Sequence, residues 1–172
     1  MSPNISDELA DFAAFYDATL PQVYRYVAYR VADTATAEDL TSAIFENALR
    51  AWNRRRKPEA LMPWIFRIAR NTVFSHYRQN GRHEALPLEA AEALPGDAGD
   101  PEQRRLEAEQ RRRARQALHT LNRREQDLIA LKFGSGMTNR ELAPLLGLSE
   151  SNVAVLLHRA LRKVQAALAE NR

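Results

Sequence analysis

The sequence predicts an all-α fold in which two small helical domains are joined by a flexible linker, the C-terminal domain containing a helix-turn-helix. Three observations favour this class. Apolar residues recur with the period of a helix in both halves of the chain. No segment of useful length shows the alternation of apolar and polar residues that is typical of a β-strand. Capping residues and helix-ending glycines punctuate the second half. A stretch rich in proline and glycine separates the two halves.

The N-terminal domain is expected over residues 1–80, a length that supports a modest core. Its first aromatic and apolar residues predict two helices, with Pro21 near the start of the second. The next helix presents an apolar face over residues 40–52, and we expect Thr36 to cap it. The last helix of this domain should span about residues 61–80.

The predicted linker, residues 81–101, holds three of the eight prolines and three of the six glycines and has no aromatic residue. Charge is unevenly distributed around it. Residues 1–40 and 85–102 each carry a net charge of −5, whereas residues 41–84 carry +6 and residues 103–172 carry +7. Two basic blocks around an acidic linker suggest two separate anionic contacts, although solvated helix faces commonly account for such charge runs.

The C-terminal domain is expected over residues 102–172. Asn122 and Thr138 each precede a glutamate by three positions, which is typical of a capping box. Gly147 is placed to end the helix that begins after Thr138, and Ser149 is placed to cap a final longer helix. A short helix, a tight turn and a longer helix are the elements of a DNA-binding helix-turn-helix, and an ordinary helical hairpin is the alternative.

Composition excludes several other classes of protein. The absence of cysteine rules out disulfides, thiolate nucleophiles and Cys-ligated metal sites. The four histidines lack metal-ligand spacing, and no phosphate-binding loop or carboxylate dyad occurs, so we expect no catalytic residue, no metal and no cofactor. No apolar run approaches the roughly 18 residues of a membrane helix, and the first residues are acidic, unlike a signal peptide. We therefore expect a cytoplasmic protein without membrane insertion.

Two blocks of the chain resemble the ECF (extracytoplasmic function) sigma factors, small members of the sigma-70 family of bacterial transcription initiation factors. The first block comprises VYRYVAYRVADTATAEDLTSAIFENALRAW (23–52) and PWIFRIARNTVFSHYRQ (63–79). The second block is LNRREQDLIALKFGSGMTNRELAPLLGLSESNVAVLLHRALRKV (121–164). The resemblance implies an alternative sigma factor, a non-catalytic subunit that directs RNA polymerase to promoters by reading their minus 10 and minus 35 elements.

The same resemblance implies the partners. They are core RNA polymerase, through the clamp helices of its largest subunit and its flap, and promoter DNA, with an anti-sigma factor as regulator. In this family residues 1–80 correspond to sigma region 2 and residues 102–172 to sigma region 4. We expect weak specific DNA binding by the isolated protein, because a tether leaves the two domains unaligned.

Three sets of site residues follow from the resemblance. Contacts to the polymerase are expected from Asp39, Leu40, Ile44, Phe45 and Ala48. Recognition and opening of the minus 10 element are expected from Arg67, Arg70, Asn71, His76, Tyr77 and Arg78. Recognition of the minus 35 element is expected from Thr138, Arg140, Ser149, Glu150, Ser151, Asn152, Val153, His158 and Arg159. The residue types suit these roles, because arginine neutralises phosphate, asparagine pairs with base edges and aromatic rings stack on exposed bases.

The sequence departs from the family pattern at three places. Ser42 and Ala43 replace the usual Gln-Glu pair, which removes polar contacts from the predicted polymerase face. Residues 154–156 are apolar where lysine and arginine are common, so DNA binding should depend less steeply on salt. Pro144 lies inside the first helix of the helix-turn-helix and removes one backbone donor.

The residues leave two other functions as alternatives. A stand-alone DNA-binding regulator would use the C-terminal helix-turn-helix but leaves the first block of motifs unexplained. A site-specific recombinase or nuclease would need a nucleophile beside cationic or metal-binding groups in the first half, and the sequence contains no such cluster.

Overall fold

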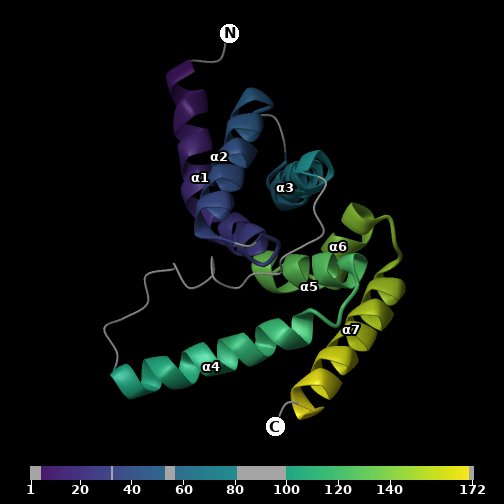
Figure 1. Ribbon diagram of the computed structural model, residues 1–172. Helices are drawn as coiled ribbons and strands as arrows, with labels where there is room; N and C mark the ends of the chain where they lie inside the picture. The colour runs from purple at the N-terminus through teal and green to yellow at the C-terminus, as the bar shows by residue number, and fades with distance from the viewer. Residues whose placement is uncertain (1–4, 32, 53–56, 81–99, 171–172) are drawn as a thin grey trace.

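The computed structural model describes residues 5–31, 33–52, 57–80 and 100–170, and within these ranges it contains seven helices and no strand (Figure 1). The N-terminal block, as we call it, consists of α1 (Ile5–Ala28), α2 (Thr34–Arg50) and α3 (Pro58–Asn80). The C-terminal block consists of α4 (Pro101–Leu118), α5 (Arg123–Ser135), α6 (Asn139–Leu146) and α7 (Glu150–Glu170). The all-α prediction is confirmed. In the part of the chain described, no helix is long and apolar enough to span a membrane.

The first helix differs from the two helices predicted. α1 continues through Pro21, which is exposed. The buried residues Phe12, Phe15, Val23 and Tyr26 keep helical spacing across the proline, so they form one uninterrupted apolar stripe. Burial of this stripe outweighs the loss of the single backbone hydrogen bond that proline cannot donate.

The start of α2 also differs from the prediction. Its N-cap is Asp33 and not Thr36, which lies in the first turn. The Asp33 carboxylate accepts hydrogen bonds from the backbone nitrogen and the hydroxyl of Thr36, both at 2.8 Å. These bonds lower the pKa of Asp33, the backbone bond contributing most. A carboxylate is the better cap here because it accepts from both donors at once.

The helix caps and the helix-ending glycine predicted for the C-terminal block are confirmed. Asn122 and Thr138 each form a full capping box with the glutamate three positions on. Gly147 ends α6 in the left-handed region with φ of 66°. The Ser149 hydroxyl accepts from the backbone nitrogen of Asn152 at 3.2 Å, which places Ser149 as the cap of α7. The predicted linker lies outside the described residues except at its last two positions, where Pro101 begins α4.

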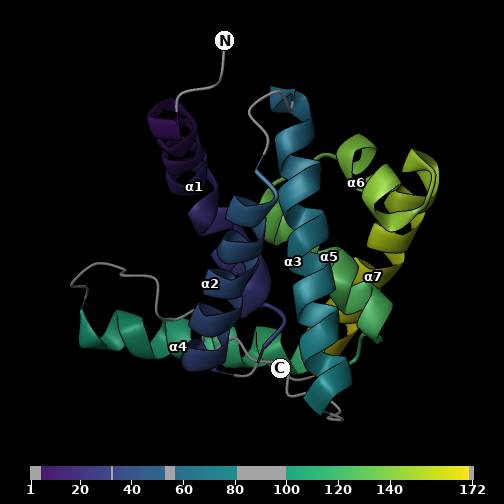
Figure 2. The same cartoon turned by 90° about the horizontal axis from the view of Figure 1, so that it is seen from above.

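The two blocks pack against each other. α1 lies along α5, α3 contacts α6, and buried residues from both blocks form one hydrophobic cluster. Figure 2 shows α3 between α2 and the helices of the C-terminal block. α4 contacts chiefly α7, and most of its described side chains are exposed. α1 and α3 therefore both border α2 on one side and the C-terminal block on the other.

Candidate nucleic-acid interface

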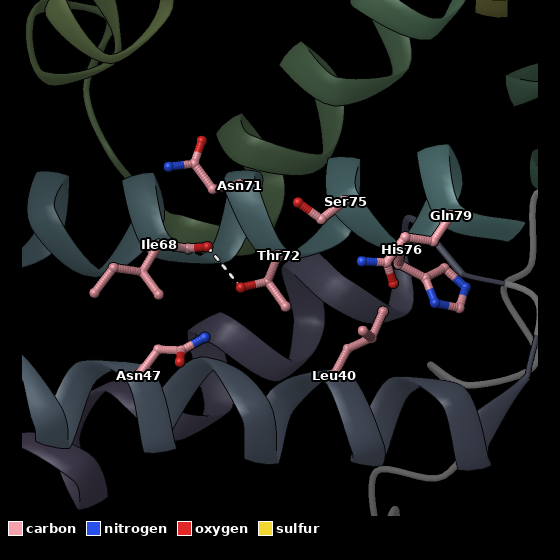
Figure 3. A pocket seen from close by; sticks show the side chains of 8 residues that line it. All are labelled: Leu40, Asn47, Ile68, Asn71, Thr72, Ser75, His76 and Gln79. Atoms are coloured by element: carbon pink, nitrogen blue, oxygen red, sulfur yellow. Dashed lines mark hydrogen bonds between the residues drawn. The ribbon is translucent and has the colours of Figure 1, made fainter.

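A polar cleft of about 450 Å³ lies between α2 and α3 (Figure 3). It falls in the range of about 300–1,000 Å³ that is usual for small-molecule pockets. The residues that line it are Leu40, Asn47, Ile68, Asn71, Thr72, Ser75, His76 and Gln79. Leu40 and Ile68 supply apolar surface, and the amide side chains each offer both a donor and an acceptor. Such a mixture suits a flat heteroaromatic group with a hydrogen-bonding edge.

The lining residues of α3 share one helical face. Ile68, Thr72 and His76 point towards α2 in Figure 3, whereas the side chains of Asn71 and Ser75 point away from α2, at the rim of the cleft. The Thr72 hydroxyl donates to the carbonyl of Ile68 at 2.9 Å, so this side chain is turned along its own helix. Spacings of three and four residues place all of these positions on one broad face of α3.

The structure places the predicted minus 10 residues in four different environments. Asn71 and His76 line the cleft, while Arg67 and Arg78 are exposed on α3. The Arg70 guanidinium does not reach the cleft, because it is bound by the C-terminal block. Tyr77 is partly buried, with its ring beneath the guanidinium of Arg30 at 5.8 Å.

Sequence reasoning missed five residues of the cleft: Asn47, Ile68, Thr72, Ser75 and Gln79. Ser75 and Gln79 follow Asn71 by four and eight positions, so the helical period of α3 was a usable signal for them. Asn47 lies on another helix, and its place opposite α3 depends on how the two helices pack.

The predicted polymerase residues occupy different depths of α2. Ile44, Phe45 and Ala48 belong to the hydrophobic core, and the Phe45 ring packs edge-on against Tyr16 with centroids 4.6 Å apart. Asp39 is exposed and Leu40 is partly exposed. The surface of this set is therefore formed by Asp39 and Leu40, while the buried members hold α2 in place.

A second hollow of about 190 Å³ lies between α1 and α2, next to these residues. Its lining includes Tyr24, Glu38 and Ser42. Burial and the nearby Glu38 carboxylate raise the pKa of Tyr24, so its hydroxyl stays protonated and able to donate. Ser42, one of the two departures from the family pattern here, thus lines a small hollow beside the exposed part of α2.

The helix-turn-helix formed by α6 and α7 presents a polar first turn. Ser149, Glu150, Ser151 and Asn152 are all exposed. The hydroxyls of the two serines lie 3.1 Å apart. Val153 is fully buried, so it holds the helix in place and offers no side-chain surface to a base. The exposed surface of α7 therefore begins with its first turn and continues through the exposed positions that follow.

The remaining predicted minus 35 residues flank this turn. Arg140, His158 and Arg159 are exposed. The hydroxyl and the backbone nitrogen of Thr138 both donate to the Glu141 carboxylate at 2.7 Å, so the Thr138 side chain is engaged in its capping box. Val155, among the apolar departures from the family pattern, is 47% exposed, which leaves a non-polar strip on α7.

Comparison with known families finds the same two-part organisation. Residues 15–83 match the family model of sigma-70 region 2, and residues 111–164 match that of sigma-70 region 4. The first match contains α3 and the cleft, and the second contains the helix-turn-helix.

Individual relatives carry related descriptions. The chain is 32% identical over 163 residues to the "ECF RNA polymerase sigma factor BldN" of Streptomyces coelicolor, which covers 93% of this chain and 61% of that protein. It is 26% identical over 152 residues to the "RNA polymerase sigma factor YlaC" of Bacillus subtilis, with 88% of each chain covered. The chain thus spans less than two thirds of the length of the first of these relatives.

The fold is also similar to solved structures. One is the sigma factor RpoE of Bartonella quintana, crystallised with the anti-sigma factor NepR, with a TM-score of 0.68 and 20% sequence identity. The match covers 94% of this chain and 99% of that chain. At this identity the likeness concerns the helical fold.

Proposed function

This chain belongs to the ECF sigma factors of the sigma-70 family, and from that premise we propose that it is an alternative sigma factor. It binds core RNA polymerase in the bacterial cytoplasm and directs promoter-specific initiation as a non-catalytic subunit. The observation that carries the proposal is the presence, in one chain, of a polar cleft in the region 2 match and an exposed polar turn on the helix-turn-helix of the region 4 match. Two such surfaces suit the two elements of a promoter.

At the minus 10 element, the cleft would hold a base that has left the duplex. Unstacking a base costs a few kcal/mol, and a pocket that binds the exposed base offsets this cost and traps the melted state. Asn71 and Asn47 can pair with the edge of the base, and Leu40 and Ile68 offer apolar surface to its face. Arg67 and Arg78 are exposed nearby and would neutralise phosphates.

At the minus 35 element, the first turn of α7 would enter the major groove of the duplex. The Asn152 amide can bind an adenine bidentately, and the Glu150 carboxylate can accept from a cytosine amino group. Arg140 and Arg159 would contact phosphates. Each phosphate contact contributes about −0.9 to the slope of the logarithm of the binding constant against the logarithm of the salt concentration. Because few cationic side chains flank this turn, we expect DNA binding to depend only weakly on salt.

Two protein partners complete the proposal. The exposed Asp39 and Leu40, beside the small hollow between α1 and α2, would meet the clamp helices of the polymerase. A polar rim beside apolar surface is the usual composition of such an interface. The similarity to a sigma factor crystallised with an anti-sigma factor supports control by a protein of that kind. We also propose that the two domains span residues 1–80 and 102–172 and that residues 81–101 link them.

Run-off transcription with core RNA polymerase from a related bacterium would test the proposal. The template is a pool of genomic promoter fragments, and binding to core is measured in parallel. We expect selective transcripts only when the protein is added, and we expect Asn71→Ala to abolish them without loss of core binding. Gln116→Ala, at an exposed position of α4, is the matched control and should transcribe normally. Specific DNA binding without any core binding would instead support a stand-alone regulator.

A further inference from the structure

The hollow of about 190 Å³ between α1 and α2 has a composition of its own. The residues that line it are Tyr16, Leu20, Tyr24, Glu38, Thr41, Ser42 and Phe45. The three from α1 follow one another at intervals of four residues, and the four from α2 have spacings of three, one and three. Because residues three and four positions apart are neighbours on a helix surface, one face of each helix lines the hollow.

The inner part of the hollow is aromatic. Phe45 is buried, and its ring packs edge-on against Tyr16 with centroids 4.6 Å apart. Tyr16 and Tyr24 are only partly buried, so both rings keep some surface that faces the hollow. The faces of aromatic rings are electron-rich and attract cations. The hollow therefore offers a cation two tyrosine rings on a rigid aromatic base.

The outer part of the hollow is acidic. Glu38 is exposed and lines the hollow. Burial and then the Glu38 carboxylate raise the pKa of Tyr24, so the carboxylate lies within electrostatic reach of that ring. The Thr41 hydroxyl donates to the carbonyl of Ala37 at 2.7 Å, so this donor is used within α2. Among the described residues that line the hollow there is no lysine, arginine or histidine to neutralise Glu38.

Size and charge together define the ligand. The volume is below the range of about 300–1,000 Å³ that is usual for small-molecule pockets, so the hollow suits one side chain better than a nucleotide or a cofactor. A carboxylate beside aromatic rings selects a cation. A guanidinium satisfies both at once, because its flat face stacks on a ring while its N–H groups bind a carboxylate in pairs. Arginine is therefore the side chain that fits best.

Two further features favour a basic partner at this place. Residues 1–40, which include α1 and the start of α2, carry a net charge of −5 and so attract a basic surface over some distance. Ser42, a departure from the family pattern, is exposed and short, so a partner's side chain can enter the hollow past it. The charge brings the partner near, and the short serine leaves the entrance open.

We propose that this hollow is a receptor for one arginine side chain of core RNA polymerase. The Glu38 carboxylate binds the guanidinium, and the rings of Tyr16 and Tyr24 stack against it. Asp39, in the exposed part of the proposed polymerase surface, directly follows Glu38 on α2, so a partner docked there also reaches the hollow. The inference rests on the proposed function, because it takes the identity of the partner from it.

Binding of a single arginine is the first measurement. N-acetyl-arginine amide and its neutral isostere N-acetyl-citrulline amide are titrated into the isotope-labelled full chain and followed by NMR. We expect saturable shifts around the hollow with the arginine amide only. Glu38→Gln, which removes the charge, and Ser42→Leu, which fills the entrance, should abolish these shifts. Glu46→Gln neutralises an exposed carboxylate of the same helix, paired with Arg50, and is the matched control. The same response to both amides, or to neither, would overturn the receptor, whatever the function of the protein.

Affinity for core RNA polymerase is the second measurement, by fluorescence anisotropy of the labelled full chain. Glu38→Gln should weaken core binding about tenfold, because a hydrogen-bonded charge loses its partner. Tyr24→Leu should weaken it about two- to fivefold at unchanged helical content, whereas Tyr24→Phe keeps the ring and should bind like the parent. Equal losses in the two Tyr24 variants would contradict stacking.

The two measurements separate failure of this inference from failure of the proposed function. Arginine binding with unchanged core affinity in Glu38→Gln and Tyr24→Leu would overturn the polymerase as the occupant, although a parent protein that directs transcription would still support the proposed function. A parent protein that binds no core polymerase would mark failure of the proposed function itself.

Discussion

The N-terminal and C-terminal blocks are both helical, but they are stabilised by different interactions. In the N-terminal block the rings of Phe12, Phe15, Trp52 and Trp64 form a cluster with centroids 5.1 to 6.1 Å apart. Its three helices are long, so each contributes several turns of buried surface. Stability here comes from aromatic side chains buried between long helices.

The C-terminal block depends more on the ends of its helices. Its core consists of aliphatic residues such as Leu131, Leu142 and Val153. α6 has only eight residues, too few to form a stable helix alone. Two capping boxes and two glycines with positive φ satisfy the backbone groups at the helix ends. The comparison shows that the short α6 depends on the hydrogen bonds at its two ends, whereas the N-terminal block depends mainly on buried aromatic side chains.

The largest effect on stability should come from the aromatic cluster. Phe15→Ala removes a buried ring that packs against three others, and we expect a loss of about 3–5 kcal/mol in the free energy of unfolding. Phe133→Ala in α5 is the matched control, because that ring is 52% exposed and its loss should cost less than about 0.5 kcal/mol. Urea unfolding followed by circular dichroism measures both. Equal losses would contradict the contrast between the blocks.

A smaller effect is expected at the end of α6. Gly147 has φ of 66°, and no atom of the described residues lies within 4 Å of an added Cβ. Gly147→Ala therefore tests backbone strain alone and should cost about 1–2 kcal/mol. Gly147→Asn should cost less, since asparagine adopts the left-handed region more readily. The same unfolding measurement applies, and an alanine variant as stable as the parent would show that α6 does not need this terminus.

Loss of a capping box should cost slightly less again. Thr138→Ala removes the hydroxyl that accepts from the Glu141 backbone nitrogen, and we expect a loss of about 1 kcal/mol. Thr138→Ser keeps the hydroxyl and should retain most of the stability. A DNA-binding defect in Thr138→Ser at full stability would indicate that the residue also contacts DNA.

The smallest effect is a dependence on pH. The Thr138 backbone nitrogen and then its hydroxyl donate to Glu141 and lower the pKa of that carboxyl below its ordinary value of 4.5. The stabilisation is therefore present above about pH 4.5 and is lost as the pH falls through the lower pKa of the folded state. Melting temperatures of the parent and Glu141→Gln should differ at pH 7 and converge in acid. A difference that grew in acid would contradict this assignment.

Much of the fold was predictable because it depends on neighbouring residues. Both capping boxes, the glycine that ends α6 and the cap of α7 are patterns of four or five consecutive positions. The predictions were wrong where the structure of a segment depends on residues farther away in the chain or on competing hydrogen-bond partners. Whether Pro21 breaks α1 depends on the apolar stripe that continues on both sides of it, and Asp33 replaced Thr36 as a cap because it accepts two hydrogen bonds.

The candidate site was predictable to a lesser degree. Helical spacing places Asn71 and His76 on the cleft side of α3, but it could not indicate that Asn47 of α2 would face them. Burial is likewise a property of the packed molecule, and it separates Val153 in the core from Asn152 on the surface although the two are adjacent.

The sequence by itself determined the all-α class and the helix ends of the second half, because these follow from the residue period and from hydrogen bonds within a turn. Only the tertiary structure decided which polar groups meet between the blocks. Asp127 binds Tyr26 across 101 positions and Arg70 across 57 positions. Gly134 lies inside α5 and permits the close approach of α5 to α1. Contacts between distant segments depend on how the helices pack, and neither periodicity nor capping specifies that arrangement.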